Sequence, residues 1–104
     1  QWAPAALRDS IAAQFPQLAL GQIGYLAMLA NVDNNLGRLL AFLEERNIDD
    51  NTILIFLSDN GGYALNGLYN AGMRGGKSRL YEGGHRVPCF IRWPNKHIGG
   101  PDQG

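Results

Sequence analysis

Cysteine and histidine are scarce in this sequence, which limits the kinds of site that it can build. The 104 residues include one cysteine, Cys89, and two histidines, His85 and His97. A single thiol excludes an internal disulfide framework and a cysteine-rich zinc module, and we expect Cys89 to be a small buried hydrophobic residue. The two histidines leave little for a histidine-based metal site.

Charge is scarce as well. Nine basic and nine acidic residues give a formal net charge of zero, and charged residues make up 17% of the chain, against about 25% in an average soluble domain. Nucleic-acid and anionic-membrane partners require a clustered basic excess, so the charge balance excludes both. The low charge indicates that the chain covers surface against a partner or belongs to something larger.

The sequence also lacks an apolar run long enough to span a membrane. Residues 10–32 carry no charge, but Pro16 and Gly21 interrupt them, and a spanning helix needs about 20 predominantly apolar residues.

We predict two helices in this part of the chain instead. One covers residues 5–14 and ends before Pro16. The other covers residues 23–46, where apolar residues recur at steps of three and four, and its first half is apolar on nearly every side, as in helices surrounded by protein. Asn47 suits the left-handed position that follows a helix.

Two apolar segments predict strands. Residues 52–57 form a continuous β-branched and apolar run without alternation, which is typical of a central parallel strand that is buried on both faces. A helix, a short loop and such a strand make half of a βαβ unit, so we expect an α/β fold. Residues 87–93 predict a second strand, with Pro88 near its start, where the missing N–H matters least.

Glycine is abundant, and much of it lies between these strands. The chain has 14 glycines, and those at 61, 62, 67, 72, 75, 76, 83 and 84 fall within residues 61–86. A loop of this length in a compact domain is usually functional, or else part of it has been wrongly assigned as loop. Asp59 and Asn60 begin it at the carboxyl end of the first strand, where α/β sheets bind ligands. Their hard oxygens suit Ca²⁺ or Mg²⁺, although Asn-Gly is also a common hairpin turn.

Two further motifs in this loop bear on chemistry. The segment Arg74-Gly75-Gly76-Lys77-Ser78 combines a glycine turn with a lysine, which suits a tetrahedral oxyanion such as phosphate or sulfate; the alternative is a solvated loop. A nucleotide P-loop is excluded because that motif needs a strand before it and a helix after it. Farther on, Glu82 and Arg86 are placed to pair, while His85 is more typical of an exposed residue than of a catalytic acid.

Taken in order, these motifs resemble the sulfatases, a family of the alkaline-phosphatase-like superfamily. The resemblance runs from about residue 25 to residue 94. It implies a partial alkaline-phosphatase-like fold with a long helix, a buried parallel strand, a Gly-rich active-site loop and a second strand. It is based on these segments: Tyr25…Asp33…Gly37, Asp50-Asn51-Thr52, residues 55–61, Arg74-Gly75-Gly76-Lys77, residues 81–84 and Arg86-Val87-Pro88.

The resemblance also implies site residues. In sulfatases, Asp and Asn side chains hold Ca²⁺, lysines hold the sulfate oxygens, and a formylglycine made from Cys or Ser attacks the sulfur. By this resemblance Asp59 and Asn60 are metal ligands, and Lys77 binds the sulfate, offsetting its charge. Three other residues match the family signature as supporting loop residues without an assigned catalytic role: Arg74, Glu82 and Arg86.

Other parts of the family pattern have no counterpart here. The sequence contains no Cys/Ser-x-Pro-x-Arg nucleophile motif, since Cys89 is followed by Phe90-Ile91-Arg92, and the first pair of metal aspartates is also missing. We therefore expect residues 1–104 to be an internal part of a sulfatase domain that is inactive alone. Formylglycine is expected only in the complete enzyme, and Ca²⁺ binding should be weak or absent. Family members are commonly exported, which implies a periplasmic or extracellular location.

Two alternatives remain open at the level of the sequence. The same superfamily includes hydrolases of phosphate or phosphonate esters, and the nucleophile that would distinguish them is not in this chain. A non-catalytic assembly module would explain the low charge and the all-round apolar helix. In either case we expect self-association through exposed apolar faces.

Overall fold

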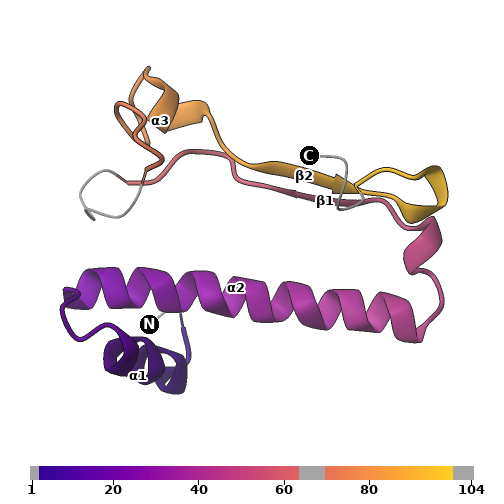
Figure 1. Cartoon of the computed structure of the whole chain (residues 1–104), viewed down its shortest axis with the longest axis horizontal. Coiled ribbons are helices and arrows are strands. Elements are labelled where there is room, and N and C mark those ends of the chain that lie inside the picture. The colour runs from indigo at the N-terminus through magenta and orange to yellow at the C-terminus, as the bar shows by residue number, and fades with distance from the viewer. Residues whose placement is uncertain (1–2, 64–69, 100–104) are drawn as a thin grey trace. The chain divides into compact units, whose positions relative to one another are not determined.

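The computed structural model describes residues 3–63 and 70–99 (Figure 1). Contacts divide the chain into two compact units, residues 1–42 and 43–104. Within the described residues, no helix is both long and apolar enough to cross a bilayer. The elements, in chain order, are α1 (Ala5–Gln14), α2 (Leu20–Glu45), the 3₁₀ helix η1 (Asp49–Asn51), β1 (Leu54–Leu57), α3 (Glu82–His85), β2 (Cys89–Arg92) and the 3₁₀ helix η3 (Pro94–Lys96).

The long helix α2 confirms the predicted periodic segment and begins slightly earlier. The Gln22 side chain accepts a hydrogen bond of 3.0 Å from the Ala19 backbone N–H, which is one half of a capping box and stabilises a start at Leu20. At the other end, Asn47 has a φ of 55°, as predicted. The N–H groups of Asn47 and Ile48 donate to the carbonyls of Glu44 and Leu43, at 2.9 and 3.1 Å. This pattern is a Schellman motif, which satisfies the last carbonyls of the helix.

Most apolar side chains of α2 are exposed or only half-buried in this chain. Ile23 and Ala27, one turn apart on the same helix face, are buried, and so is Leu43 near the far end of the helix. Others on the helix are 44–48% exposed: Leu29, Val32, Leu39 and Phe42. We expect the first half of this helix to be surrounded by protein, and within this chain only part of it is covered.

The sequence predicts a parallel strand at residues 52–57, and within the described residues this strand has β2 as its partner. β1 pairs with β2 in antiparallel register, from Leu54 opposite Arg92 to Leu57 opposite Cys89. A parallel neighbour requires a crossover connection, usually through a helix, whereas the described parts of residues 58–88 contain only loop and the four-residue α3. The apolar run of β1 indicated apolar surroundings, but it did not specify the direction of the neighbouring strand.

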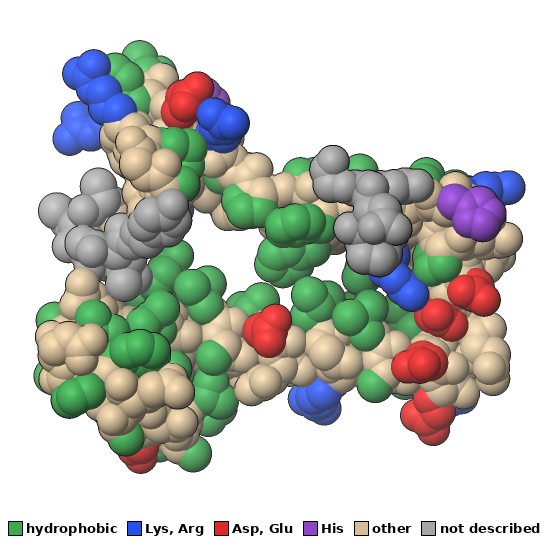
Figure 2. Space-filling view, in the orientation of Figure 1, with side chains coloured by type: hydrophobic (Ala, Val, Ile, Leu, Met, Phe, Trp, Pro, Cys, Tyr) green, Lys and Arg blue, Asp and Glu red, His purple; other side chains and the backbone are tan. Residues whose placement is uncertain are grey.

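The predicted burial of both strand faces is wrong for this chain. Ile55 and Leu57 of β1 are 55% and 57% exposed, and Phe90 of β2 is 64% exposed. Figure 2 shows hydrophobic side chains on the surface along both strands. Cys89 is exposed as well, contrary to expectation, because it begins β2 at the surface of a sheet that has only two described strands.

Three glycines join the loop to the end of β1, and we refer to Gly61, Gly83 and Gly84 as the glycine clasp. The Gly61 N–H donates to the Gly84 carbonyl at 3.0 Å. A Cβ added to Gly61 would overlap the carbonyl oxygen of Gly83, and a Cβ on Gly84 would overlap that of Arg79. The backbones approach this closely because these residues have no side chain.

The close contacts of the glycine clasp predict that a Gly→Ala substitution destabilises the fold at Gly61 but not at its neighbour Gly62. Gly61→Ala should lower the free energy of unfolding by about 2 kcal/mol or more, because backbone atoms must move to admit the methyl group. Gly62→Ala is the matched control, since a Cβ there would have no atom within 4 Å. Urea unfolding followed by tryptophan fluorescence measures both. Equal midpoints for the two variants would contradict the close approach.

Candidate functional site

The predicted metal ligands directly follow β1. The Ser58 N–H donates to the Pro88 carbonyl at 3.4 Å, which extends the contact between the two strands. The Ser58 hydroxyl donates to the Asn60 carbonyl at 2.8 Å and closes a tight turn. Within that turn the Asp59 side chain is exposed and Asn60 is half-buried. The exposed Asp59 side chain thus lies just beyond the carboxyl end of β1.

The predicted anion ligand, Lys77, is tied to the same end of β1. Its N–H donates to the Gly62 carbonyl at 2.9 Å, two residues beyond Asn60. With the bond from Gly61 to Gly84, this holds both sides of the loop against the segment that follows Asp59. The Lys77 side chain is exposed. The structure therefore brings the two predicted parts of the site together through backbone hydrogen bonds.

The loop that carries Lys77 has an internal hydrogen-bond network centred on Asn70. Its side-chain amide donates to the carbonyls of Met73, at 3.1 Å, and Gly75, at 2.8 Å. The Gly83 N–H donates to the Arg74 carbonyl at 2.9 Å. No motif in the sequence marks Asn70 as a site residue. Asparagine is a common turn residue, which was the one available signal, but its partners depend on the folded path of the loop.

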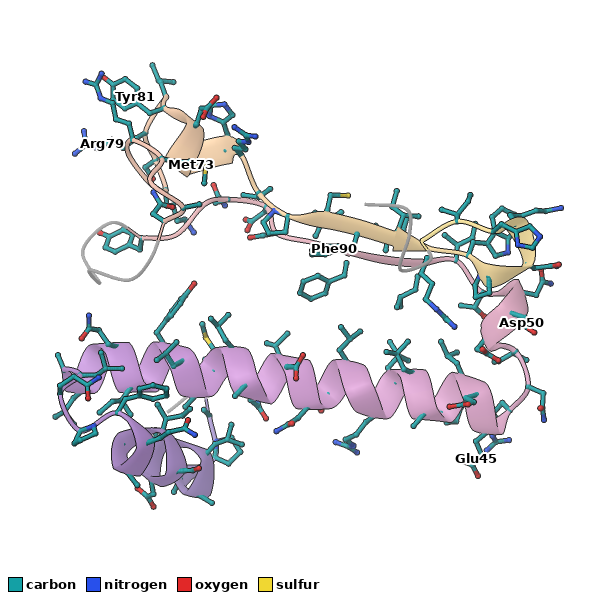
Figure 3. All side chains as sticks on the ribbon, viewed as in Figure 1. Glu45, Asp50, Met73, Arg79, Tyr81 and Phe90 are labelled. Atoms are coloured by element: carbon teal, nitrogen blue, oxygen red, sulfur yellow. The ribbon has the colours of Figure 1, made fainter. Side chains whose placement is uncertain are left out.

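The supporting residues Arg74, Glu82 and Arg86 are engaged with neighbours on the loop. The Arg74 guanidinium lies 3.7 Å from the centroid of the Tyr81 ring, a cation–π contact that the spacing of the two residues does not reveal. Figure 3 shows Tyr81 on this loop, with Met73 and Arg79. Glu82 and Arg86 form the anticipated ion pair at 3.3 Å. Both are largely exposed, so the pair contributes little to stability.

The residues present fit part of a calcium site. Asp59 and Asn60 offer oxygen donors of the kind that Ca²⁺ prefers, but the ion takes six to eight oxygens. Within residues 3–63 and 70–99, no three His, Cys, Asp or Glu side chains are grouped so that they could hold a metal ion. Among the described residues, Asp59 and Asn60 would therefore supply only a fraction of the ligands that such a site requires.

The Lys77 loop contains two of the four non-glycine residues that have a positive φ in the described part of the chain. Ala71 and Ser78 have φ values of 50° and 68°, in the left-handed region that costs a side-chain-bearing residue about 1–2 kcal/mol. Gly72 and Gly75 also have positive φ values, which glycine adopts readily. Strain of this kind persists where surrounding contacts fix the backbone, and it is common at functional sites.

Comparisons with known proteins agree on one family. The family model described as Sulfatase matches residues 23–98. The chain is 33% identical over 100 residues to N-acetylgalactosamine-6-sulfatase of Canis lupus familiaris, covering 91% of this chain and 19% of that protein. It is 41% identical over 69 residues to an arylsulfatase of Hemicentrotus pulcherrimus, covering 64% of this chain and 12% of that protein.

A solved structure resembles the fold. The crystal structure of Ps i-CgsB in complex with k-i-k-neocarrahexaose superposes with a TM-score of 0.77 at 36% sequence identity. The match covers 88% of this chain and 21% of that one. The chain thus spans about a fifth or less of the length of these similar proteins.

The strain at Ala71 predicts opposite effects of one substitution at two sites. Ala71→Gly should raise the free energy of unfolding by up to about 1 kcal/mol, because glycine relieves the cost of the positive φ. Ala41→Gly, on the exposed surface of α2, should lower it by about 1 kcal/mol. Thermal unfolding followed by circular dichroism compares them, and a destabilised Ala71→Gly variant would contradict the assigned strain.

Proposed function

The chain belongs to the sulfatase family, and from that premise we propose that it is part of a sulfatase catalytic domain, whose complete form hydrolyses sulfate esters. The observation that carries the proposal is the hydrogen bond from the Lys77 N–H to the Gly62 carbonyl. It keeps a candidate anion ligand beside the segment that contains the two candidate metal ligands, Asp59 and Asn60. Residues 1–104 are proposed to act as one partial domain.

Asp59 and Asn60 are proposed to hold a divalent cation, Ca²⁺, together with further oxygen ligands from the rest of the domain. The exposed Asp59 carboxylate supports this role, since it is available to an ion at the end of β1. When bound, such a cation withdraws electron density from the sulfate ester. Two ligands provide too few oxygens for tight binding, so the chain alone should bind Ca²⁺ weakly.

Lys77 is proposed to bind a sulfate oxygen. Its ammonium group is a compact positive charge with three donors, which stabilises negative charge on the transferred group. Arg74 lies three residues away, but the Tyr81 ring occupies one face of its guanidinium. That contact supports a role for Arg74 in holding the loop, and Lys77 is the preferred anion ligand.

The chain on its own is proposed to be inactive. Sulfate ester hydrolysis of this type needs the formylglycine nucleophile, and the sequence contains no Cys/Ser-x-Pro-x-Arg motif from which to make it. Cys89 cannot substitute, because it lies in β2 opposite Leu57 and lacks the motif's proline and arginine. The nucleophile therefore has to come from the rest of the catalytic domain.

Sulfate binding without turnover is the expected behaviour of the isolated chain. Sodium sulfate, added at constant ionic strength, should shift the Lys77 amide signal in ¹⁵N NMR spectra. Lys77→Ala should abolish the response of the loop. Lys96→Ala is the matched control, because it removes a lysine from η3, outside the loop. The Lys96 ammonium lies 5.8 Å from the centroid of the Trp93 ring. An aryl sulfate should not be hydrolysed above the buffer rate, and turnover that disappears in Asp59→Ala would contradict the proposed inactivity.

The exposed strands support self-association of the isolated chain. Phe56 and Phe90 face each other across the sheet, with ring centroids 6.4 Å apart, and are 39% and 64% exposed. An uncovered apolar sheet with unpaired edges is prone to associate with other chains. In the complete domain these side chains are proposed to pack against other parts of the protein.

Sedimentation velocity tests this expectation. At micromolar concentration the chain should sediment as species larger than the 11.4 kDa monomer. Phe90→Thr should shift the distribution toward monomer, because threonine retains strand propensity but removes the aromatic surface. Leu80→Thr is the control, since Leu80 is 98% exposed outside the strands. A well-folded monomer of the unmodified chain would contradict self-association.

A further inference from the structure

Asn70 has a role in the loop that no motif of the sequence explains. Its half-buried amide uses both N–H protons, one for the Met73 carbonyl and one for the Gly75 carbonyl, at 3.1 and 2.8 Å. The turn is closed in the other direction by the Met73 N–H, which donates to the Asn70 carbonyl at 2.9 Å. One side chain therefore fixes the path of residues 70–75.

Further contacts link Asn70 and Gly75 to the glycine clasp, close to Lys77. A Cβ built on Gly83 would lie 2.5 Å from the Asn70 amide nitrogen and 2.6 Å from the Gly75 carbonyl oxygen, so Asn70 and Gly75 both pack against the glycine clasp. Two residues after Gly75, the Lys77 N–H reaches the Gly62 carbonyl. The Asn70 amide thus fixes the backbone up to Gly75, and two residues later the Lys77 N–H joins the loop to the segment that follows Asn60.

We propose that Asn70 is a positioning residue for Lys77, holding the ammonium-bearing loop in the conformation that receives a sulfate oxygen. This inference rests on the proposed anion-binding role of Lys77. The proposed role of Asn70 requires two N–H donors directed at two carbonyls. An amide provides them, whereas a carboxylate of the same shape has only acceptors. Asn70 does not itself bind the anion, and its effect is transmitted through Gly75.

The test compares Asn70→Ala with Asn95→Ala in the 104-residue chain. Asn95 also donates an amide hydrogen bond, to Asn51 at 3.5 Å, but it is exposed and lies in η3. Asn70→Ala should accelerate hydrogen exchange of the Lys77 and Gly83 amides at least about tenfold, because two partly buried hydrogen bonds are lost. It should also weaken sulfate binding, measured by NMR titration, at least about threefold. Asn95→Ala should leave both quantities within about twofold of the unmodified chain.

Asn70→Asp separates the loss of donors from the loss of volume. The substitution keeps the side-chain shape, so amide exchange as fast as in Asn70→Ala would support the donor argument. Its added charge would itself weaken anion binding, and for this variant only exchange is compared.

Two results would overturn the inference. One is unchanged exchange of the Lys77 and Gly83 amides in Asn70→Ala. The other is accelerated exchange with unchanged sulfate affinity, which would make Asn70 purely structural. If the unmodified chain shows no sulfate response at Lys77, the proposed function fails instead. Exchange then still decides whether Asn70 holds the loop.

Discussion

The close backbone contact between Gly61 and Gly83 is the constraint on which the candidate site depends. A strand end that carries Asp59 and Asn60 and a loop that carries Lys77 are far apart in sequence. They meet because carbonyl and amide groups approach more closely than any side chain would allow. The abundance of glycine in this part of the chain thus has a steric cause. It permits the contact, and backbone hydrogen bonds hold it in place, among them the bond from the Gly61 N–H to the Gly84 carbonyl.

Local features of the fold could be predicted because local sequence determines them. The three- and four-residue periodicity located α2, and Asn47 marked its end through a preference for the left-handed conformation. The apolar run located β1. The direction of its neighbour could not be predicted, because an apolar strand is compatible with either direction and the connecting loop decides between them. The exposure of Ile55 and Phe90 likewise depends on which elements are present to cover them.

In the candidate site, too, some residues could be predicted from the sequence while others depend on the folded loop. Asp59, Asn60 and Lys77 were predicted from side-chain chemistry and from the order of motifs, and the ion pair of Glu82 and Arg86 followed from their spacing. Asn70 and Tyr81 were missed because their partners are a pair of carbonyls and a guanidinium that only the folded loop brings within reach. A hydrogen bond from a side chain to a backbone carbonyl is hard to predict from sequence, because every residue has a carbonyl that could accept it.

The surface position of Cys89 has a practical consequence. A single accessible thiol gives this chain a natural attachment point for a fluorescent or paramagnetic label, with no need to remove competing cysteines. It lies opposite Leu57, the last residue of β1, next to the turn from which Asp59 and Asn60 extend. A reporter placed there would be sensitive to any change in the pairing of the two strand ends beside the candidate site.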